Sequence, residues 1–184
     1  MKDLIALIRG KAFVLRCRYW KRTIQIDEGF KIYKKLKIEG PGKVYIGKNC
    51  IIDGIRGDES QYVSIDTHSS DAIISLGDNV SLYAARLSSR FQITIGDDVL
   101  IEESGIVDTD FHTLDKSRKL PASENKDKCQ IIIGNRVCVG VKSVITKGVT
   151  IGDNVIIMPG SVVSMSVKSG HTVCGNPAKV ISLK

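Results

Sequence analysis

The chain has 184 residues, which is the size of one domain and leaves room for a sizeable core. Aromatic residues make up only 5% of the chain and glycine is plentiful at 17, a composition that favours short strands and tight turns and argues against a helical bundle. The net charge of +7 is unevenly spread, because residues 1–48 hold 13 Lys and Arg against 4 Asp and Glu.

Two further classes of protein are excluded by simple patterns. No run of about 18 apolar residues predicts a transmembrane helix, and the start MKDLIALIRGKAFVL carries too much charge for a secretory signal peptide. The five cysteines form no CxxC pair, which argues against a disulfide framework and a zinc site. We therefore expect a cytoplasmic protein with reduced cysteines and no metal.

Residues 1–43 form a basic N-terminal segment with a predicted helix at its start. Apolar residues recur there at helical spacing, namely Leu4, Ile8, Ala12, Leu15 and Tyr19. Such an amphipathic helix can cover the open end of a core, or it can lie on an anionic surface such as the inner membrane. No recognised nucleic-acid motif accompanies the charge, so nucleic acid is not an expected partner.

The clearest feature of the chain is a six-residue repeat. From Ile133 the chain divides into IGNRVC, VGVKSV, ITKGVT, IGDNVI, IMPGSV and VSMSVK, and the first position is Ile or Val each time. A period of six suits neither an alternating strand nor an amphipathic helix. Three hexads make one triangular coil, so each apolar first residue stacks on its equivalent in the next coil. The predicted pairs are Ile133 on Ile151, Val139 on Ile157 and Ile145 on Val163.

The same pattern continues upstream in a less regular form. It is visible in IGKNCI from Ile46, in LGDNVS and LYAARL from Leu76, and in IGDDVL, IEESGI and VDTDFH from Ile95. The sequence therefore predicts an all-β parallel β-helix over residues 44–168. Residues 54–75 lose the phase, which predicts an offset or a bulge. A polar segment at about 108–131 breaks the count and predicts an extruded loop.

Three features together resemble the hexapeptide-repeat acyltransferases. They are the run IGNRVCVGVKSVITKGVTIGDNVIIMPGSVV, the later GNPAKVI, and a histidine just before an extruded loop. The pattern, from about Val44 to Ile181, is most like the bacterial O-acetyltransferases of the galactoside, maltose, capsule and colanic-acid type. The resemblance implies a left-handed β-helix, a homotrimer with active sites between subunits, acetyl-CoA as the donor and a carbohydrate acceptor in polysaccharide biosynthesis.

The resemblance makes His112 the candidate general base. Acetyl transfer to a sugar hydroxyl needs a base that takes the hydroxyl proton as the oxygen attacks the thioester carbonyl. His112 ends VDTDFH, the third hexad of the coil that opens at Ile95, which matches the catalytic histidine of the galactoside type in register. Asp110 or Asp108 would fix the imidazole tautomer. His68 and His171 fit this role less well.

The resemblance also implies a donor groove. Pantetheine would run along the backbone of Gly140, Val141 and the turn Pro159–Gly160, with the Val141 N–H as a possible oxyanion donor. Residues 169–184 form a C-terminal tail that would close over this groove, with Asn176 near the adenine end and Lys179 on a phosphate.

Some positions depart from the family pattern. Ser164 belongs to the same predicted set, but Ser164–Met165 replace a common Thr-Lys pair. A phosphate contact would then come from Lys142, Lys147 or Lys168.

Other functions remain open at this point. A sugar N-acetyltransferase would need the same donor groove. A metal-dependent β-helix enzyme of the carbonic-anhydrase type would need three converging histidines, whereas the three histidines of this chain are not separated by whole coils of three hexads. A non-catalytic β-helix for assembly or binding would tolerate the loss of His112. Nothing in the loop indicates which sugar is acylated.

Overall fold

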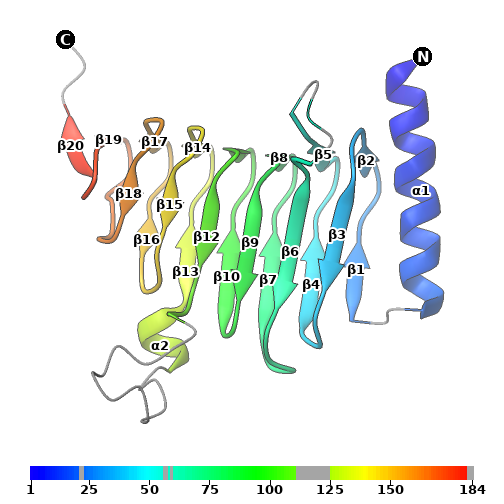
Figure 1. The fold of residues 1–184 in the computed structure, drawn as a ribbon, viewed down its shortest axis with the longest axis horizontal. Helices are drawn as coiled ribbons and strands as arrows, with labels where there is room; N and C mark the ends of the chain where they lie inside the picture. The colour runs from blue at the N-terminus through cyan, green and yellow to red at the C-terminus, as the bar shows by residue number, and fades with distance from the viewer. Residues whose placement is uncertain (21–22, 56–57, 59, 111–124, 182–184) are drawn as a thin grey trace.

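The computed structural model describes residues 1–20, 23–55, 58, 60–110 and 125–181, and the chain forms an elongated stack of three-sided coils (Figure 1). Each coil contributes one strand to each of three sheets. Helix α1, Lys2–Trp20, lies across one end of the stack, and the C-terminus lies at the other end. The predicted all-β parallel architecture is confirmed.

The three sheets are named A, B and C in the order in which the chain visits them, and all strand pairs are parallel except β19 with β20. Sheet A comprises β1 (Ile24–Ile26), β4 (Lys43–Ile46), β7 (Ile73–Leu76), β10 (Gln92–Ile95), β13 (Ile131–Ile133) and β16 (Thr150–Ile151). Sheet B comprises β2 (Lys31–Ile32), β5 (Ile51–Asp53), β8 (Ser81–Tyr83), β11 (Leu100–Glu102), β14 (Cys138–Val139), β17 (Ile156–Ile157), β19 (Thr172–Cys174) and β20 (Lys179–Ile181). Sheet C comprises β3 (Leu36–Glu39), β6 (Val63–Thr67), β9 (Arg86–Ser89), β12 (Gly105–Val107), β15 (Val144–Ile145) and β18 (Val162–Val163).

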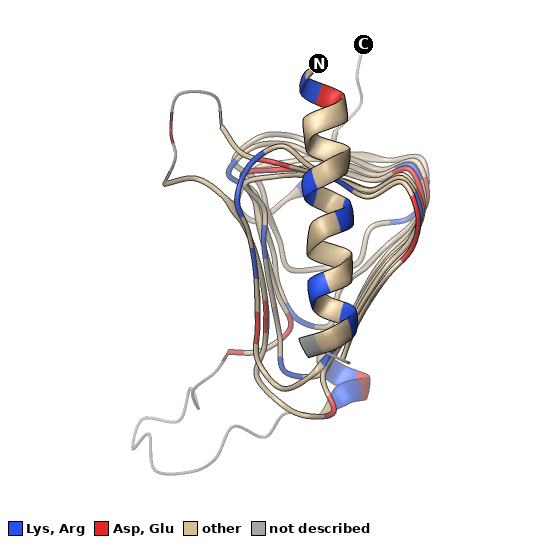
Figure 2. Ribbon diagram, turned by 90° about the vertical axis from the view of Figure 1, so that its right-hand side faces the viewer, with Lys and Arg blue, Asp and Glu red and all other residues tan. Residues whose placement is uncertain are grey.

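Coil 1 is β1–β2–β3, and coils 2 to 6 follow in the same order. We call the turn from sheet A to sheet B the first corner, that from B to C the second corner, and that from C to the next A the third corner. Figure 2 looks down the stack from α1: the chain passes the three corners in counter-clockwise order as it recedes from the viewer. The β-helix is therefore left-handed, as the resemblance implies.

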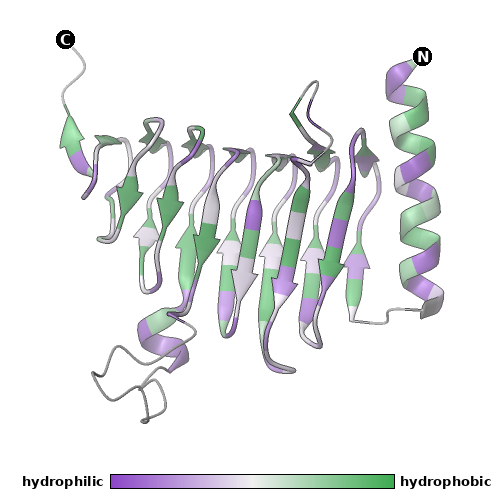
Figure 3. Cartoon of the chain, in the orientation of Figure 1, coloured by the Kyte–Doolittle hydropathy of each residue, from purple (hydrophilic) through white to green (hydrophobic). Residues whose placement is uncertain are grey.

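The core is a set of ladders of inward-facing Ile, Val and Leu side chains. The three predicted stacking pairs are all present, namely Ile133 with Ile151, Val139 with Ile157, and Ile145 with Val163. These six residues are buried, and together with their equivalents in other coils they form one continuous cluster. In Figure 3 the strands of coils 5 and 6 are accordingly mostly hydrophobic. Stacking supplies the burial that a single coil cannot achieve.

The β-helix begins earlier than the sequence predicts. Ile24 of β1 pairs with Val44 of β4, and β2 and β3 extend the other two sheets in the same way, so coil 1 occupies residues 24–39. The predicted start at residue 44 is therefore wrong. The repeat is hard to recognise in this segment for two reasons. The step from Ile24 to Val44 is longer than three hexads, and the segment is rich in lysine.

The second corner explains the irregular hexads upstream. Leu82 is followed by the inward-facing Leu87, and Ile101 by Ile106, a step of five residues in each case. The sequence predicts Val107 as the inward-facing first residue of the third hexad. In the structure this residue is Ile106, which is buried, whereas Val107 faces outward.

Of the two predicted explanations for the stretch 54–75, the structure shows an offset produced by insertions, and not a bulge. After Ile52, the residue of sheet C that stacks on Leu87 of the next coil is Ile65, and the residue of sheet A that stacks on Ile93 is Ile74. In coil 3 the corresponding residues are Leu82, Leu87 and Ile93, so both steps are shorter there. The extra residues lie at the second and third corners of coil 2, and the strands on either side keep their register.

The larger excursion lies where the sequence predicts it, between coils 4 and 5. Ile93 of β10 pairs with Ile131 of β13, a step far longer than three hexads. The described end of this excursion is helix α2, Lys126–Cys129, which Asn125 caps by accepting from the Lys128 N–H at 3.0 Å. The buried Cys129 accepts a hydrogen bond through its carbonyl from the Gly148 N–H, which fixes α2 against the third corner.

The first corner is built alike in successive coils. Left-handed backbone recurs there at Gly29, Asn49, Asn79, Asp98, Arg136 and Asn154. Each following coil also supplies a side chain to the coil before it: Asp153 Oδ1 accepts from the Asn135 N–H at 2.7 Å, and Asn135 Oδ1 accepts from the Asp97 N–H at 2.8 Å. A Cβ at Gly134 would lie 2.4 Å from Asp153 Oδ1. The recurrent Ile-Gly-Asp/Asn pattern of the sequence therefore encodes this ladder.

Helix α1 covers the open end of coil 1. Its buried residues are Ala6, Gly10 and Cys17, and a Cβ at Gly10 would lie 1.9 Å from the carbonyl oxygen of Phe30, so the helix backbone rests directly on the coil. The Tyr33 hydroxyl donates to Asp3 Oδ1 at 2.6 Å, and this bond raises the pKa of Tyr33 to about 12. Among the described residues, no helix is both long and apolar enough to cross a membrane.

The apolar stripe that the sequence singles out in this helix does not cover the core. Its members Leu4, Ile8, Leu15 and Tyr19 are exposed. A different, less conspicuous face makes the contact: the small residues Ala6, Gly10 and Cys17 let the helix backbone approach the coil, and Phe13 and Val14 pack against the core beside them.

Candidate functional site

The predicted site residues gather at two corners of the stack. Gly140, Val141, Pro159 and Gly160 lie at the second corner of coils 5 and 6, where sheet C begins. Asp110 and Ser164 lie at the third corner, where sheet C ends. His112 lies outside the described residues.

The second corner is one residue longer in coils 5 and 6 than in coils 3 and 4. Val139 is followed by the inward-facing Ile145 after six residues, whereas Ile101 is followed by Ile106 after five. The Val141 carbonyl accepts from the Gly160 N–H at 2.9 Å. No described residue accepts a hydrogen bond from the Val141 N–H, so the longer corner leaves this donor available to a ligand.

Gly140 is required by the close stacking of coils 5 and 6. Its N–H donates to the Ile157 carbonyl at 2.9 Å, and a Cβ at this position would lie 2.8 Å from the Pro159 nitrogen and 2.9 Å from the Ile157 oxygen. A larger residue would separate the two coils at the second corner. The predicted glycine therefore has a structural function whether or not a cofactor passes over it.

A ladder of buried serines supports this corner from inside. Ser104 Oγ donates to the Gly140 carbonyl at 2.9 Å and accepts from the Ser143 N–H at 3.1 Å. Ser143 Oγ accepts from the Ser161 N–H at 3.3 Å and donates to the Met158 carbonyl at 3.2 Å. The repeat showed a serine at the fifth position of two hexads, but it gave no indication that these side chains hold the corner together.

The tail packs beside the same corner. The Val162 N–H donates to the Gly175 carbonyl at 2.9 Å, and the Ala178 N–H donates to the Val162 carbonyl at 2.8 Å. Asn176 lies between these two contacts, so the structure brings it to the start of β18. Lys179 is exposed in β20, which folds back antiparallel on β19.

The third corner carries an ion pair. Lys147 of coil 5 binds the carboxylate of Asp110, which follows β12 in coil 4, and both side chains are partly exposed. Ser164 is exposed at the same corner of coil 6.

Asp108 is fully buried beneath this corner and anchors the corner of coil 3. Its carboxylate accepts hydrogen bonds from Ser89 Oγ at 2.6 Å, from the Arg90 N–H at 2.7 Å and from the Phe91 N–H at 2.9 Å. Asp108 therefore fixes the backbone of the preceding coil, a function that sequence reasoning missed.

The three lysines considered as phosphate contacts are separated by the fold. Lys142 is exposed at the second corner beside Val141, and its backbone is left-handed with φ 58°. Lys147 binds Asp110 at the third corner. Lys168 precedes the first corner of the last turn, where its carbonyl accepts from His171 Nδ1. Lys142 is the member of this set that lies with the predicted groove.

Cys138 begins the approach to Gly140 on sheet B. Burial raises the pKa of its thiol, and the nearby Glu102 carboxylate acts in the same direction. The thiol is therefore protonated and uncharged at neutral pH.

The remaining two histidines lie far apart in the coil order. His68 lies at the third corner of coil 2, with Nε2 2.8 Å from Ser88 Oγ. His171 lies at the first corner after coil 6, where Nδ1 faces the carbonyls of Lys168 and Ser169. These two do not occupy neighbouring coils, as a three-histidine metal site would require. Within the described part of the chain, no group of three His, Cys, Asp or Glu side chains is arranged to hold a metal ion.

Comparison with known proteins identifies the repeat and the fold. Residues 130–164 match the family model described as the hexapeptide repeat of succinyl-transferase. No curated protein matches the chain. The chain therefore contains hexapeptide repeats and has the left-handed β-helix fold of the solved structures to which it is similar.

Three solved structures illustrate that similarity. The polysialic acid O-acetyltransferase OatWY aligns with a TM-score of 0.68 at 22% identity over 86% of this chain and 74% of that one. The N-acyltransferase AntD from Bacillus cereus, in complex with dTDP and coenzyme A, aligns with a TM-score of 0.61 at 20% identity over 87% and 83%. A hexapeptide-repeat acetyltransferase from Vibrio cholerae, complexed with acetyl coenzyme A, aligns with a TM-score of 0.55 at 22% identity over 97% and 86%.

Proposed function

We propose that this protein is an acetyl-CoA-dependent O-acetyltransferase that acylates a sugar hydroxyl of a surface polysaccharide or its precursor in the cytoplasm. The observation that carries the proposal is the lengthened second corner of coils 5 and 6. It leaves the Val141 N–H without a described acceptor, and the tail that contains Asn176 packs against the same corner in the next coil. The fold is shared with acetyltransferases, one of which was solved with acetyl coenzyme A.

The donor would lie along the second corner. Pantetheine would pass the backbone of Gly140 and Val141 and the turn Pro159–Gly160, with the adenine end near Asn176. The exposed ammonium groups of Lys142 and Lys179 are suited to the phosphates. Ser164 lies at the other end of sheet C in the same chain, so in this proposal it would contact a donor held mainly by a neighbouring subunit.

The chemistry requires a base and an oxyanion donor. His112 would take the proton of the sugar hydroxyl while the hydroxyl oxygen attacks the thioester carbonyl. The Val141 N–H would donate to the oxyanion of the tetrahedral intermediate, which then collapses with loss of the coenzyme A thiolate. The imidazolium would return its proton to that thiolate. Asp110, which binds Lys147, lies two residues before His112 and would orient its imidazole.

The two halves of this site favour a homotrimer. The second and third corners lie at opposite ends of each strand of sheet C, and the six-residue step from Val141 to Lys147 spans at most about 20 Å when fully extended. In this proposal the donor groove of one chain therefore works with the third corner, and with the His112 that follows Asp110 in the sequence, of a neighbouring copy. A neighbouring copy that sets its third corner against this second corner would complete the site.

Acylation of a sugar amine is the second candidate. The similarity to an N-acyltransferase from Bacillus cereus favours it specifically. The same groove and base would serve an amine, and the acceptor decides between the two reactions. A non-catalytic β-helix would need neither the lengthened corner nor the tail contact.

The test is release of free coenzyme A from acetyl-CoA in the presence of a panel of glycans and amino sugars. Turnover with a hydroxyl acceptor is expected, and His112→Ala should lower it by about 10² or more, the contribution of a general base. His171→Ala is the matched control, since this ring faces backbone carbonyls at the first corner. Full turnover by the His112→Ala protein would refute the mechanism, and a monomer mass in light scattering would refute the shared site.

A further inference from the structure

Helix α1 is apolar on two faces, and only one of them contacts the β-helix. The inner face, with Ala6, Gly10 and Cys17, is buried on coil 1. The outer face exposes Leu4, Ile8, Leu15 and Tyr19, whose accessible fractions are 61%, 58%, 53% and 75%. Four large exposed apolar side chains on one side of a short helix are unusual for a surface that meets only water.

Basic residues border this outer stripe on both sides. At about 100° of rotation per residue, Lys11 and Arg18 fall along one edge of the stripe, and Lys2, Arg9 and Arg16 fall along the other. Figure 2 shows this arrangement: charged positions alternate on the two edges of α1, and uncharged residues face the viewer between them. The single acidic residue of the helix, Asp3, accepts a hydrogen bond from Tyr33.

The position of the helix makes the stripe accessible to a flat surface. Helix α1 crosses the end of the stack, and the coils all lie on one side of it (Figure 1). The outer stripe therefore faces away from the coils, along the long axis of the molecule. In Figure 3 hydrophobic segments recur along the length of α1, between hydrophilic ones.

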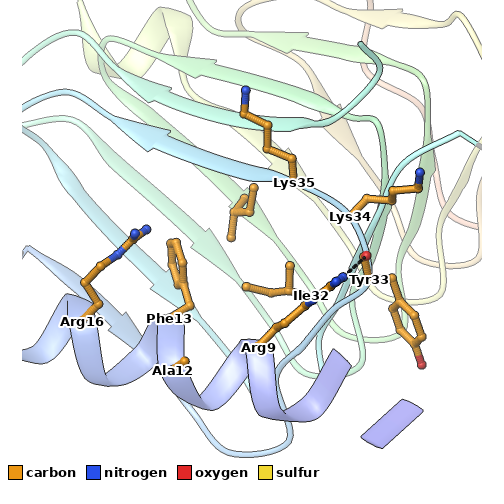
Figure 4. A pocket seen from close by; sticks show the side chains of 9 residues that line it. Arg9, Ala12, Phe13, Arg16, Ile32, Tyr33, Lys34 and Lys35 are labelled. Atoms are coloured by element: carbon orange, nitrogen blue, oxygen red, sulfur yellow. Dashed lines mark hydrogen bonds between the residues drawn. The ribbon is translucent and has the colours of Figure 1, made fainter. Parts of the chain in front are cut away.

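A basic cleft adjoins the stripe. A cavity of about 720 Å³ lies between α1 and coil 1, with Phe13 and Ile32 among its lining residues and Arg16, Lys34 and Lys35 around it (Figure 4). Arg9 also lines it and donates to the Tyr33 carbonyl at 2.9 Å. Cations around an apolar floor suit a phosphate group attached to a hydrophobic chain.

We propose that the outer face of α1 binds an anionic lipid membrane, with Leu4, Ile8 and Leu15 at the acyl boundary and the flanking Lys and Arg side chains among the phosphate headgroups. An apolar stripe between two basic edges matches both layers of such an interface. A second copy of this chain fits less well, because two α1 helices face to face would oppose their positive charges. Nucleic acid would match the charge but not the stripe.

This proposal does not depend on acetyl transfer. A single helix of this kind binds a membrane weakly and reversibly. If three copies assemble with parallel coils, as the proposed function requires, three α1 helices would lie at the same end and would bind together. The membrane would then hold the enzyme with its stack perpendicular to the lipid surface.

Co-sedimentation of the full-length protein with lipid vesicles tests the proposal. The protein should bind vesicles of equal parts phosphatidylcholine and phosphatidylglycerol at least about tenfold more tightly than vesicles of phosphatidylcholine alone. The double variant Ile8→Glu, Leu15→Glu should lose at least about tenfold of that binding. Met165→Glu is the matched control, because this exposed apolar residue lies toward the other end of the stack and should leave binding unchanged.

A charge variant keeps the test valid if the double variant fails to fold. Lys11→Gln with Arg18→Gln should weaken binding by about fivefold per charge removed, since each basic residue near an anionic membrane contributes about 1 kcal/mol. Equal binding to both kinds of vesicle, or no binding at low salt, would overturn the proposal. So would a mass in light scattering that halves when Ile8 and Leu15 are replaced, because it would identify a second copy as the occupant.

Discussion

The first and second corners turn the same chain through similar angles, but they are built from different residues. At the first corner the left-handed positions are mostly Asn, Asp or Gly, which tolerate that backbone. At the second corner the left-handed residues are Ala84, Glu103 and Lys142, with φ of 49°, 42° and 58°, followed by Gly160. These three side chains adopt that conformation at a cost of about 1–2 kcal/mol each.

The difference between the corners separates stability from function. The first corner repeats one ladder of side-chain to backbone bonds with little change, as a purely structural element would. The second corner changes length between coils 4 and 5 and retains strained residues, and the third corner admits the long excursion. Strain that persists beside a variable turn is typical of functional sites.

The largest expected effect on stability is at Asp108, beneath the third corner. Asp108→Ala removes three hydrogen bonds and leaves the buried Ser89 hydroxyl and two partly buried backbone N–H groups without this partner, so it should lower the free energy of unfolding by roughly 3 kcal/mol. Asp153→Ala at the first corner removes the single bond to the Asn135 N–H and should cost about 1 kcal/mol. Urea denaturation measures both values. Equal losses would mean that the regular ladder holds the stack as firmly as the buried carboxylate.

The next prediction compares one substitution at two corners of coil 5. Gly134→Ala and Gly140→Ala each insert a methyl group into a contact below 3 Å, so each should destabilise the protein by about 1–3 kcal/mol. Only Gly140→Ala displaces the backbone beside Val141, so only this variant should also raise the KM for acetyl-CoA, by about tenfold for a loss of about 1.4 kcal/mol in donor binding. Steady-state kinetics below the unfolding temperature separates the two effects. An unchanged KM in the Gly140→Ala protein would argue against a donor at the second corner.

The regular coils could be predicted closely from the sequence, and the irregular ones could not. From Ile133 onward each hexad has one apolar first residue, and all three stacking pairs follow from that pattern. Upstream, Ile106 and Val107 are adjacent and both apolar, so the pattern alone does not reveal which one faces inward. The shorter corner decides it, and corner length depends on backbone conformation that a hydrophobic pattern does not encode.

The helix and the site show the same limit in different ways. Both faces of α1 are apolar, so periodicity identified the helix and its outer stripe but did not reveal which face contacts coil 1; the small residues Ala6 and Gly10 were the signal for close contact. The residues that the resemblance named for the donor lie close together at the second corner, with Asn176 of the distant tail near the start of β18, and their contact with a donor stays a prediction. Their support by Ser104, Ser143 and Ser161 depends on stacking across coils, which no local motif contains.

The smallest expected effect is a gain in stability, and it concerns the left-handed backbone of Lys142. The left-handed backbone at Lys142 costs about 1–2 kcal/mol, and Lys142→Gly removes that cost. Glycine also makes the unfolded chain more flexible, which lowers stability by about 0.5–1 kcal/mol. The protein should therefore become more stable by about 0.5–1 kcal/mol. Asn49→Gly at the first corner, where φ is 56°, should give no gain, because asparagine already tolerates this backbone. Thermal unfolding compares the two variants. If the second corner is shaped by its ligand, the Lys142→Gly protein should combine higher stability with weaker binding of acetyl-CoA, since it also loses an exposed ammonium beside Val141. A variant that gains stability and keeps its donor affinity would show that the strained lysine serves neither purpose.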